Sequence, residues 1–214
     1  MQYWLIGFLP TKVIFTRIYK RHIWGNRETV SGAGSTIEST SNVRRELPIL
    51  LKELGAKSLL DIPCGDFHWF QEINFELEKY IGADIVGELI ELNARRYAGK
   101  RISFICLDIT KDALPSADVL LCRDCLVHLS TRNILRVVRN IKSTSARYLI
   151  TTTFPDVKEN IDVPTGSFRP INLQLPPFNF PMPMRLLYEY TIEGEPSLRK
   201  CLGVWRVEYL RGKV

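Results

Sequence analysis

Three aspartates each close an apolar stretch that the sequence predicts to be a buried strand. The stretches, written with their final acids, are Ser58–Asp61, Lys79–Asp84 and Ile102–Asp108. Runs of this kind are typical of parallel strands, whose carboxyl ends meet at one edge of a sheet. Carboxylates that lie close together destabilise an empty fold, so we expect a ligand that donates hydrogen bonds at this edge.

The second acid stands about twenty residues beyond the first, which is the spacing that nucleotide-binding folds show. At the end of a second strand, Asp84 could accept hydrogen bonds from both hydroxyls of a ribose. A polar residue that merely ends a strand would give the same pattern. The spacing favours the ribose role.

A turn with one glycine follows the first strand and consists of Pro63, Cys64, Gly65 and Asp66. Pro63 has no N–H for a strand ladder, and Gly65 can adopt backbone angles closed to other residues. From Phe67 the apolar residues recur at helical spacing, which predicts a helix capped by Asp66. One glycine is too few to cradle a pyrophosphate, whereas a phosphate-free ligand such as S-adenosylmethionine (SAM) needs only one close backbone approach and nearby acids. The alternative is an ordinary α/β strand–turn–helix unit.

A second polar group follows the predicted strand Ala117–Cys122 and contains Arg123, Asp124 and His128. An unperturbed imidazole titrates near neutrality, so His128 could take a proton from a hydroxyl. Asp124 could itself act as that base or orient the imidazole. The alternative is that His128 packs at the start of the next helix, for which Ser130 is the predicted N-cap.

Further elements must position these groups. Apolar spacing predicts helices over Val13–Trp24, Val43–Leu54, Glu88–Tyr97 and Arg132–Ile141. The remaining predicted strands are Ala146–Thr153 and an antiparallel pair, Met184–Ile192 and Leu202–Leu210. Pro48 predicts either a start of its helix near this residue or a kink. Helices that alternate with strands indicate an α/β fold.

Two long segments separate these elements. Residues 25–42 are polar and contain the run S-G-A-G-S-T, which fits either a linker or a lid over the ligand. Residues 154–184 are rich in proline but keep aromatic and aliphatic side chains, so we interpret them as an ordered acceptor-binding loop. Within that loop, Arg169 and Asn172 are the expected polar contacts. Arg44 could meet a carboxylate or lie solvated on its helix.

The length of 214 residues predicts a single domain, in which residues 1–42 form a helix and lid loop and residues 43–214 bind the ligand. The formal charge of +6 would allow an acidic partner such as nucleic acid, a phosphate-bearing carrier or a membrane surface. The basic residues cluster as they do on solvated helix faces, so we expect no nucleic-acid partner. The apolar run at residues 3–9 is too short to span a bilayer, and we expect it to pack on the domain rather than lie on a membrane surface.

The sequence contains five cysteines, an odd number. Cys64, Cys106 and Cys122 fall on or beside predicted buried strands, which suits reduced thiols in a cytoplasm. Cys122 and Cys125 form a C-x-x-C, but the chain holds no second such pair and no pair of histidines at ligand spacing. We therefore expect no zinc site.

Motifs along nearly the whole chain resemble those of one family. In order they are W-G, S-G-A-G-S, D-I-P-C-G-D-F-H-W, Y-I-G-A-D-I-V, F-I-C-L-D-I, L-C-R-D-C-L-V-H-L, T-T-T-F and T-G-S-F-R-P-I-N-L-Q-L-P-P-F. Together they resemble a subgroup of class I SAM-dependent methyltransferases of bacteria and large viruses, often found alongside glycosyltransferases of surface-glycan synthesis. The resemblance implies a Rossmann-like, doubly wound, seven-stranded and mainly parallel sheet with an antiparallel C-terminal strand pair.

The resemblance and the residue patterns together assign the site. The expected SAM-binding residues are Asp61, Pro63, Cys64, Gly65, Asp66, Asp84, Ile85, Asp108, Ile109, Arg123, Ser35 and Arg44. His128 and Asp124 are expected at the reacting methyl group. The expected acceptor-binding residues are Trp24, Arg169, Asn172 and Phe178. The chain departs from the wider superfamily at Pro63 and Phe67, where glycines are usual.

The implied reaction is a direct displacement that moves a methyl group to a sugar hydroxyl, with the protein positioning the oxygen and removing its proton. A metal-dependent version would need clustered carboxylates near the fourth strand, and beyond Asp124 none is evident, so we expect no metal. The implied partners are a glycan acceptor and glycosyltransferases, in the cytoplasm or, for a virus, the host cytoplasm. The alternatives are an RNA or small-molecule methyltransferase and a non-catalytic SAM-binding scaffold.

Overall fold

The structure is a computed structural model, and it describes residues 9–192 and 195–210, with the side chains of 190–197 left undescribed. The apolar N-terminal run, which was expected to pack on the domain, lies outside the described residues except for Leu9. Within the described part of the chain, no helix is long and apolar enough to cross a membrane.

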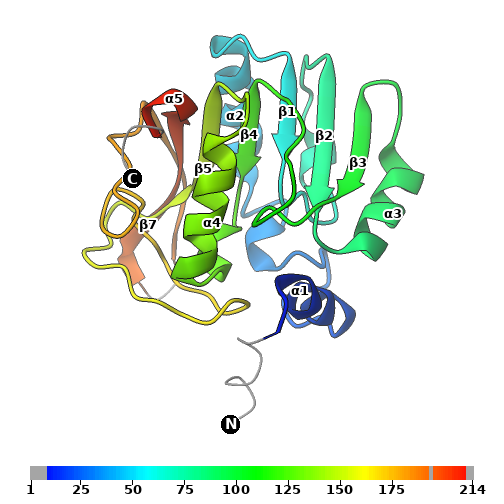
Figure 1. The fold of residues 1–214 in the computed structure, drawn as a ribbon. Helices are drawn as coiled ribbons and strands as arrows, with labels where there is room; N and C mark the ends of the chain where they lie inside the picture. Colours follow the sequence, from blue (N-terminus) through cyan, green and yellow to red (C-terminus); the bar gives the residue numbers. More distant parts are fainter. Residues whose placement is uncertain (1–8, 193–194, 211–214) are drawn as a thin grey trace.

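A seven-stranded sheet forms the centre of the fold, with strand order β3-β2-β1-β4-β5-β7-β6 (Figure 1). The strands are β1 Ser58–Asp61, β2 Lys79–Asp84, β3 Ile102–Cys106, β4 Val119–Cys122, β5 Tyr148–Thr153, β6 Arg185–Ile192 and β7 Glu195–Arg206. β1 to β5 run parallel, whereas β7 is antiparallel to both β5 and β6. The predicted mainly parallel sheet with an antiparallel C-terminal pair is confirmed.

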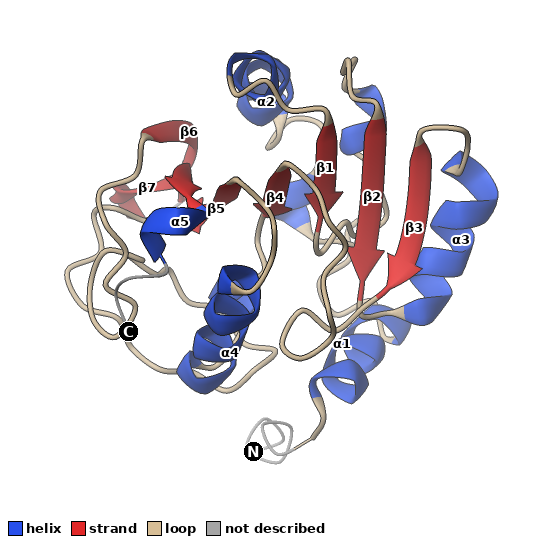
Figure 2. Cartoon of the chain, turned by 45° about the horizontal axis from the view of Figure 1, so that its top comes forward, coloured by secondary structure: helices blue, strands red, loops and turns tan. Residues whose placement is uncertain are grey.

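Helices cover both faces of this sheet, as Figure 2 shows for α2 and α4. The helices are α1 Thr11–Lys20, α2 Ser41–Glu53, α3 Gly87–Tyr97, α4 Thr131–Lys142 and the short α5 Val207–Leu210. Successive strand residues such as Leu59 and Leu60 point to opposite faces and enter two separate cores. This two-sided burial explains why the strands read as unbroken apolar runs.

Pro48 does not delay the start of its helix. α2 begins at Ser41 and runs through Pro48, so the expected start near the proline is wrong. Val43, Leu47, Leu50 and Leu51 are fully or almost fully buried along one side of α2. Their packing outweighs the cost of about 3 kcal/mol that a proline imposes on a helix interior.

The helix predicted from Phe67 is also wrong. The chain there forms turns and a single 3-10 helix, Phe70–Glu72. Phe67 has a φ of 59°, a left-handed conformation that cannot begin an α-helix. Its ring instead packs 5.2 Å from that of Tyr80 and 5.3 Å from that of Phe104, measured between centroids. The apolar spacing that suggested a helix therefore belongs to an aromatic cluster.

The remaining boundaries shift mostly by a few residues. α1 ends at Lys20 rather than Trp24, because the chain turns at His22, whose φ is 50°. The last predicted strand is in fact β7, which starts at Glu195, followed by α5. Residues 154–184 contain no helix or strand, yet they bury apolar side chains among them. Those side chains are Phe154, Ile171, Leu173, Phe178 and Phe180.

Candidate active site

A cavity of about 420 Å³ lies at the carboxyl ends of the parallel strands, next to α1. Cavities of this size hold small-molecule ligands. The predicted site residues that line it are Trp24, Ser35, Pro63, Cys64, Gly65, Asp84, Ile85, Asp108, Ile109, Arg123, Asp124 and His128. Those that do not line it are Asp61, Asp66, Arg44, Arg169, Asn172 and Phe178.

Asp61 is turned away from this cavity. Its carboxylate is buried and accepts a hydrogen bond of 2.7 Å from the Tyr80 hydroxyl of the neighbouring strand. Burial raises the pKa of Asp61 to about 7. The expectation that three strand-end acids share one cavity is therefore corrected to two, because the Asp61 carboxylate is held by the Tyr80 hydroxyl and does not line the cavity.

Asp84 does face the cavity. Its two carboxylate oxygens accept hydrogen bonds from the backbone N–H groups of Gly65 (3.3 Å) and Val86 (3.0 Å). Burial raises the pKa of Asp84 to about 6. Gly65 has a φ of 54°, and Asn93 donates a 2.7 Å hydrogen bond to its carbonyl. Asn93 had no recognisable signal in the sequence, since it lies mid-helix in α3.

Asp108 also lines the cavity, and its side chain is buried. One of its carboxylate oxygens accepts hydrogen bonds from the N–H (3.0 Å) and hydroxyl (2.6 Å) of Thr110. The apolar side chains of Ile85 and Ile109 line the same part of the site. This region thus combines a buried acid with apolar walls.

The loop between α1 and α2 closes over the glycine turn. The Asp66 carboxylate accepts hydrogen bonds from the Thr29 hydroxyl (2.7 Å), the Val30 N–H (3.0 Å) and the Ser31 hydroxyl (3.0 Å). A Cβ at Gly65 would collide with the Ser31 hydroxyl oxygen. Asp66 therefore anchors this loop rather than capping a helix.

The far end of the same loop is held by two arginines. Arg123 donates a 2.7 Å hydrogen bond from Nη2 to the carbonyl of Gly34. Arg44 donates a 2.9 Å hydrogen bond from Nη2 to the carbonyl of Ile37. Arg44 therefore contacts the loop backbone, and the structure gives it no place on the cavity wall.

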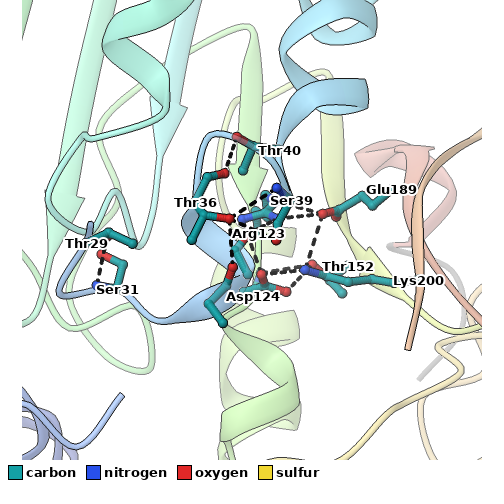
Figure 3. Close-up of polar contacts among 12 residues, drawn as sticks. Thr29, Ser31, Thr36, Ser39, Thr40, Arg123, Asp124, Thr152, Glu189 and Lys200 are labelled. Carbon is teal, nitrogen blue, oxygen red and sulfur yellow. Dashed lines mark hydrogen bonds and ion pairs between the residues drawn. The ribbon is translucent and has the colours of Figure 1, made fainter. Parts of the chain in front are cut away.

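Four charged side chains form a network on the β4–β7 side of the cavity (Figure 3). Asp124 accepts a 2.6 Å hydrogen bond from the Lys200 Nζ and lies 3.2 Å from Arg123 Nη1. Glu189 accepts a 2.6 Å hydrogen bond from Arg123 Nη2 and lies 3.2 Å from the Lys200 ammonium. Although burial acts in the opposite direction, the charges of Lys200 and Arg123 hold the pKa of Asp124 below its usual value.

Lys200 and Glu189 were missed from the sequence. Both lie on the antiparallel pair β6–β7, far along the chain from Asp124. Glu189 had a signal, a charged residue at an inward position of the predicted strand Met184–Ile192, whereas Lys200 had none because it precedes the predicted strand Leu202–Leu210; both side chains are almost fully buried. The pairing of β7 with β5 brings Lys200 to the cavity, and the pairing of β6 with β7 brings Glu189 beside Lys200.

His128 lines the same cavity as the glycine turn. Its ring contacts that of Trp24, tilted by 31° with centroids 4.2 Å apart, and its centroid lies 5.7 Å from that of Phe168. Its Nδ1 lies 3.0 Å from the carbonyl oxygen of Ser167, so Ser167 rather than Asp124 orients the ring. Burial lowers the pKa of His128, and the charge of Asp124 partly offsets this.

The residues expected to contact an acceptor from the long loop hold the loop itself. Asn172 donates hydrogen bonds of 3.1 Å to the carbonyls of Pro155 and Val157. Phe178 is buried in the core. Arg169 is buried and donates a 2.6 Å hydrogen bond to the carbonyl of Leu129. Phe168, which was not assigned a role, instead lines the cavity and is 53% exposed.

No group of three or more His, Cys, Asp or Glu side chains is arranged to hold a metal ion in the described ranges, 9–192 and 195–210. Cys122 is buried, and its C-x-x-C partner Cys125 lines the cavity. All five cysteines are free thiols.

Comparison of the sequence with family models gave no match, and comparison with curated proteins gave none. Several solved structures are similar. Magnesium protoporphyrin IX methyltransferase from Synechocystis, solved with SAM, is 15% identical with a TM-score of 0.58, over 92% of this chain and 98% of that one. Human N-acetylserotonin methyltransferase in complex with SAM is 15% identical with a TM-score of 0.60, over 91% and 59%.

A third similar structure is the 1,6-didemethyltoxoflavin-N1-methyltransferase of Burkholderia thailandensis, with bound S-adenosylhomocysteine. It is 17% identical with a TM-score of 0.59, over 91% of this chain and 86% of that one. At such identities the likeness concerns the fold. The strand order and the antiparallel end of the sheet agree with it, so the chain has the Rossmann-like fold of class I methyltransferases.

Proposed function

We propose that the protein is a SAM-dependent O-methyltransferase that acts on a hydroxyl of a sugar, in a surface glycan or its precursor. One observation carries the proposal: a single cavity joins the glycine turn and the acids after β2 and β3 to the His128 imidazole. Two of the similar structures contain SAM, which supports the same ligand here.

The residues on the cofactor side fit SAM. Asp84 would accept hydrogen bonds from the ribose hydroxyls, because a carboxylate has about four lone-pair sites and its backbone N–H contacts do not fill all of them. Asp108, between Ile85 and Ile109, would accept the adenine amino group. Gly65 allows close approach of the ligand to the backbone. When bound, SAM supplies a methyl group that is already activated.

On the other side, His128 takes the proton of the acceptor hydroxyl. Burial keeps its imidazole neutral near pH 7, which a base requires. Asp124 is a poor base, since two cations stabilise its ionised form. Asp124 therefore has a structural role: its ion pairs fix the part of the cavity wall next to His128.

The acceptor side suits an uncharged ring. Phe15, Trp24, His128 and Phe168 line it as a row of rings with successive centroids 5.7, 4.2 and 5.7 Å apart. The nearby charges are compensated within the protein, so they offer little to an ionic acceptor. The C–H face of a sugar can pack on such rings. A planar phenol could do the same and is the second candidate acceptor.

Calorimetry with SAM and its demethylated product tests whether the protein binds SAM. Methyl-transfer assays on neutral glycosides, phenols, acidic sugars and RNA test which acceptor it methylates. We expect His128→Asn to lower kcat/KM by about 10²- to 10⁴-fold, because it removes the ring nitrogen that takes the proton. SAM binding should not change.

His22→Asn is the matched control, because His22 is exposed and outside the cavity, and asparagine tolerates its left-handed backbone. It should act like the unaltered protein. Absence of SAM binding would overturn the whole proposal. Transfer at the original rate in His128→Asn would overturn the assignment of the base, and preference for phenols would replace the sugar.

A further inference from the structure

The segment 162–169 of the long loop, called the strap below, is bonded to the turn that carries His128. The carbonyls of three consecutive turn residues each accept a hydrogen bond from it. Val127 accepts from the Arg169 N–H (3.1 Å), His128 from the Gly166 N–H (2.8 Å) and Leu129 from Arg169 Nη1 (2.6 Å).

The next two residues of the turn are held as well. The Ser130 N–H donates to the Thr165 hydroxyl oxygen (3.1 Å), and the Thr131 N–H donates to an Asp162 carboxylate oxygen (2.7 Å). Five consecutive residues, 127–131, thus direct a backbone group to the strap. So complete a set of bonds fixes the position of this turn closely.

One bond runs to the imidazole itself. Its Nδ1 lies 3.0 Å from the carbonyl oxygen of Ser167. A carbonyl oxygen can only accept, so Nδ1 must carry the hydrogen and donate it. In the neutral ring, Nε2 then holds the free lone pair.

We propose that Arg169 and the strap are the positioning elements of the base, and that they keep the neutral His128 protonated on Nδ1 so that Nε2 receives the proton of the acceptor. The role of His128 as a base rests on the proposed function, whereas the position of its hydrogen does not. Arg169 acts through the backbone of residues 127 and 129, on either side of the histidine.

Arg169 is an unusual choice for a purely structural anchor. Its side chain is buried, and its Nε and Nη2 atoms have no hydrogen-bond partner in the part of the chain that the structure describes. Burying a cation with so few hydrogen bonds costs free energy, so its position here indicates a role beyond holding the loop in place. Its positive charge also disfavours protonation of the neighbouring imidazole, as does that of Lys200, whereas Asp124 favours it.

The strap also joins the base to α1. Gly166 has a φ of 98°, and a Cβ there would lie 2.8 Å from Cγ2 of Ile14. Ile14 belongs to α1 and is buried. The glycine thus lets α1 pack against the strap at the point where the strap meets the turn.

The position of the hydrogen can be measured directly. The sequence has only three histidines, so ¹⁵N spectra of histidine-labelled protein at a pH above neutrality can be assigned with His128→Asn. We expect His128 to carry its hydrogen on Nδ1. A hydrogen on Nε2, or an even mixture of the two tautomers, would overturn the proposal, and neither result depends on methyl transfer.

Arg169→Met tests the anchor, with Arg169→Lys as the conservative variant and Arg139→Met, on the exposed side of α4, as the matched control. For Arg169→Met we expect mixed tautomers, an about tenfold lower kcat, unchanged SAM binding and a rate–pH limb shifted to higher pH, because a positive charge beside His128 is lost. Arg169→Lys should restore the pH limb and most of the rate. A pure Nδ1–H tautomer and an unshifted limb in Arg169→Met would show that Arg169 has only a structural role.

Discussion

Two aspartates at the same edge of the sheet differ in what surrounds them. Asp84, after β2, is held by backbone N–H groups alone, and burial raises its pKa to about 6. Asp124, after β4, is paired with Lys200 and Arg123, whose charges hold its pKa below the usual value. Both line the same cavity.

The two aspartates therefore differ in role: Asp84 is available to bind a ligand, whereas Asp124 stabilises the protein. No cation among the described residues pairs with Asp84, and its carboxylate has lone pairs free, so hydrogen-bond donors of a ligand would stabilise it. Asp124 is already satisfied by the protein, so a ligand adds little to it. Of these two carboxylates, the one without a cation partner among the described residues is the better candidate for ligand binding.

We expect the largest effect from removing Lys200, whose ammonium lies 2.6 Å from the Asp124 carboxylate. Among the residues that the structure describes, Lys200→Met would leave Arg123 as the cation that contacts both Asp124 and the buried Glu189. We expect the free energy of unfolding to fall by about 3–5 kcal/mol, the usual result of breaking a buried ion pair. Denaturant unfolding measures it.

Two comparisons control this experiment. Lys57→Met removes an exposed ion pair with Glu78 and should cost under about 1 kcal/mol. Adding Glu189→Gln to Lys200→Met restores charge balance among the four groups and should recover a substantial part of the loss. A loss no larger than that of Lys57→Met would contradict the difference drawn between the two aspartates.

The matched pair Asp84→Asn and Asp124→Asn should give opposite results. Asp84→Asn should weaken SAM binding by about 1.5–3 kcal/mol, the value of hydrogen bonds to a charged group, with little loss of stability. Asp124→Asn should lower stability and change SAM affinity by less than about threefold, since its oxygens serve the protein. Calorimetry and unfolding on both variants test this, and equal losses of SAM affinity would remove the distinction.

The smallest effect is in the pH dependence. A folded pKa of about 6 means that the empty protein binds a proton at Asp84 that the unfolded chain has released, so this group's stabilising contribution is lost as pH rises from about 4 to about 6. SAM hydroxyls prefer the ionised carboxylate. We therefore expect SAM affinity to rise about tenfold from pH 5 to pH 7.

Asp61 titrates in the same range, with a folded pKa of about 7, but lies outside the cavity. Asp84→Asn should therefore abolish the pH dependence of SAM affinity while leaving the Asp61 contribution to stability. If the dependence persists in Asp84→Asn, another group binds the ribose. Asp124 should show the reverse trend in stability, because its lowered pKa adds stability that is lost only as the pH falls well below 4.

Local patterns predicted the sheet well and the turn after β1 poorly. Apolar runs gave the correct strands: β1, β2, β4 and β5 are buried on both faces, and the edge strand β3 keeps the apolar pattern although much of it is exposed. Phe67 and Phe70 have helical spacing but belong to an aromatic cluster with Tyr80. Spacing alone does not distinguish these cases, since both bury apolar residues at similar intervals.

The amino-acid sequence by itself determined where the parallel strands lie, the glycine turn, and the positions of Asp84 and Asp108 at or just after strand ends, because these depend on short segments with strong local patterns. Tertiary structure alone decided that Asp61 turns to Tyr80, that Lys200 reaches Asp124, that Glu189 reaches Arg123, and that Ser167 meets His128. Those partners lie 19 to 76 residues apart along the chain. Charge and hydrogen-bond pairing act over ångströms in space, so their outcome depends on which distant segments the fold brings together.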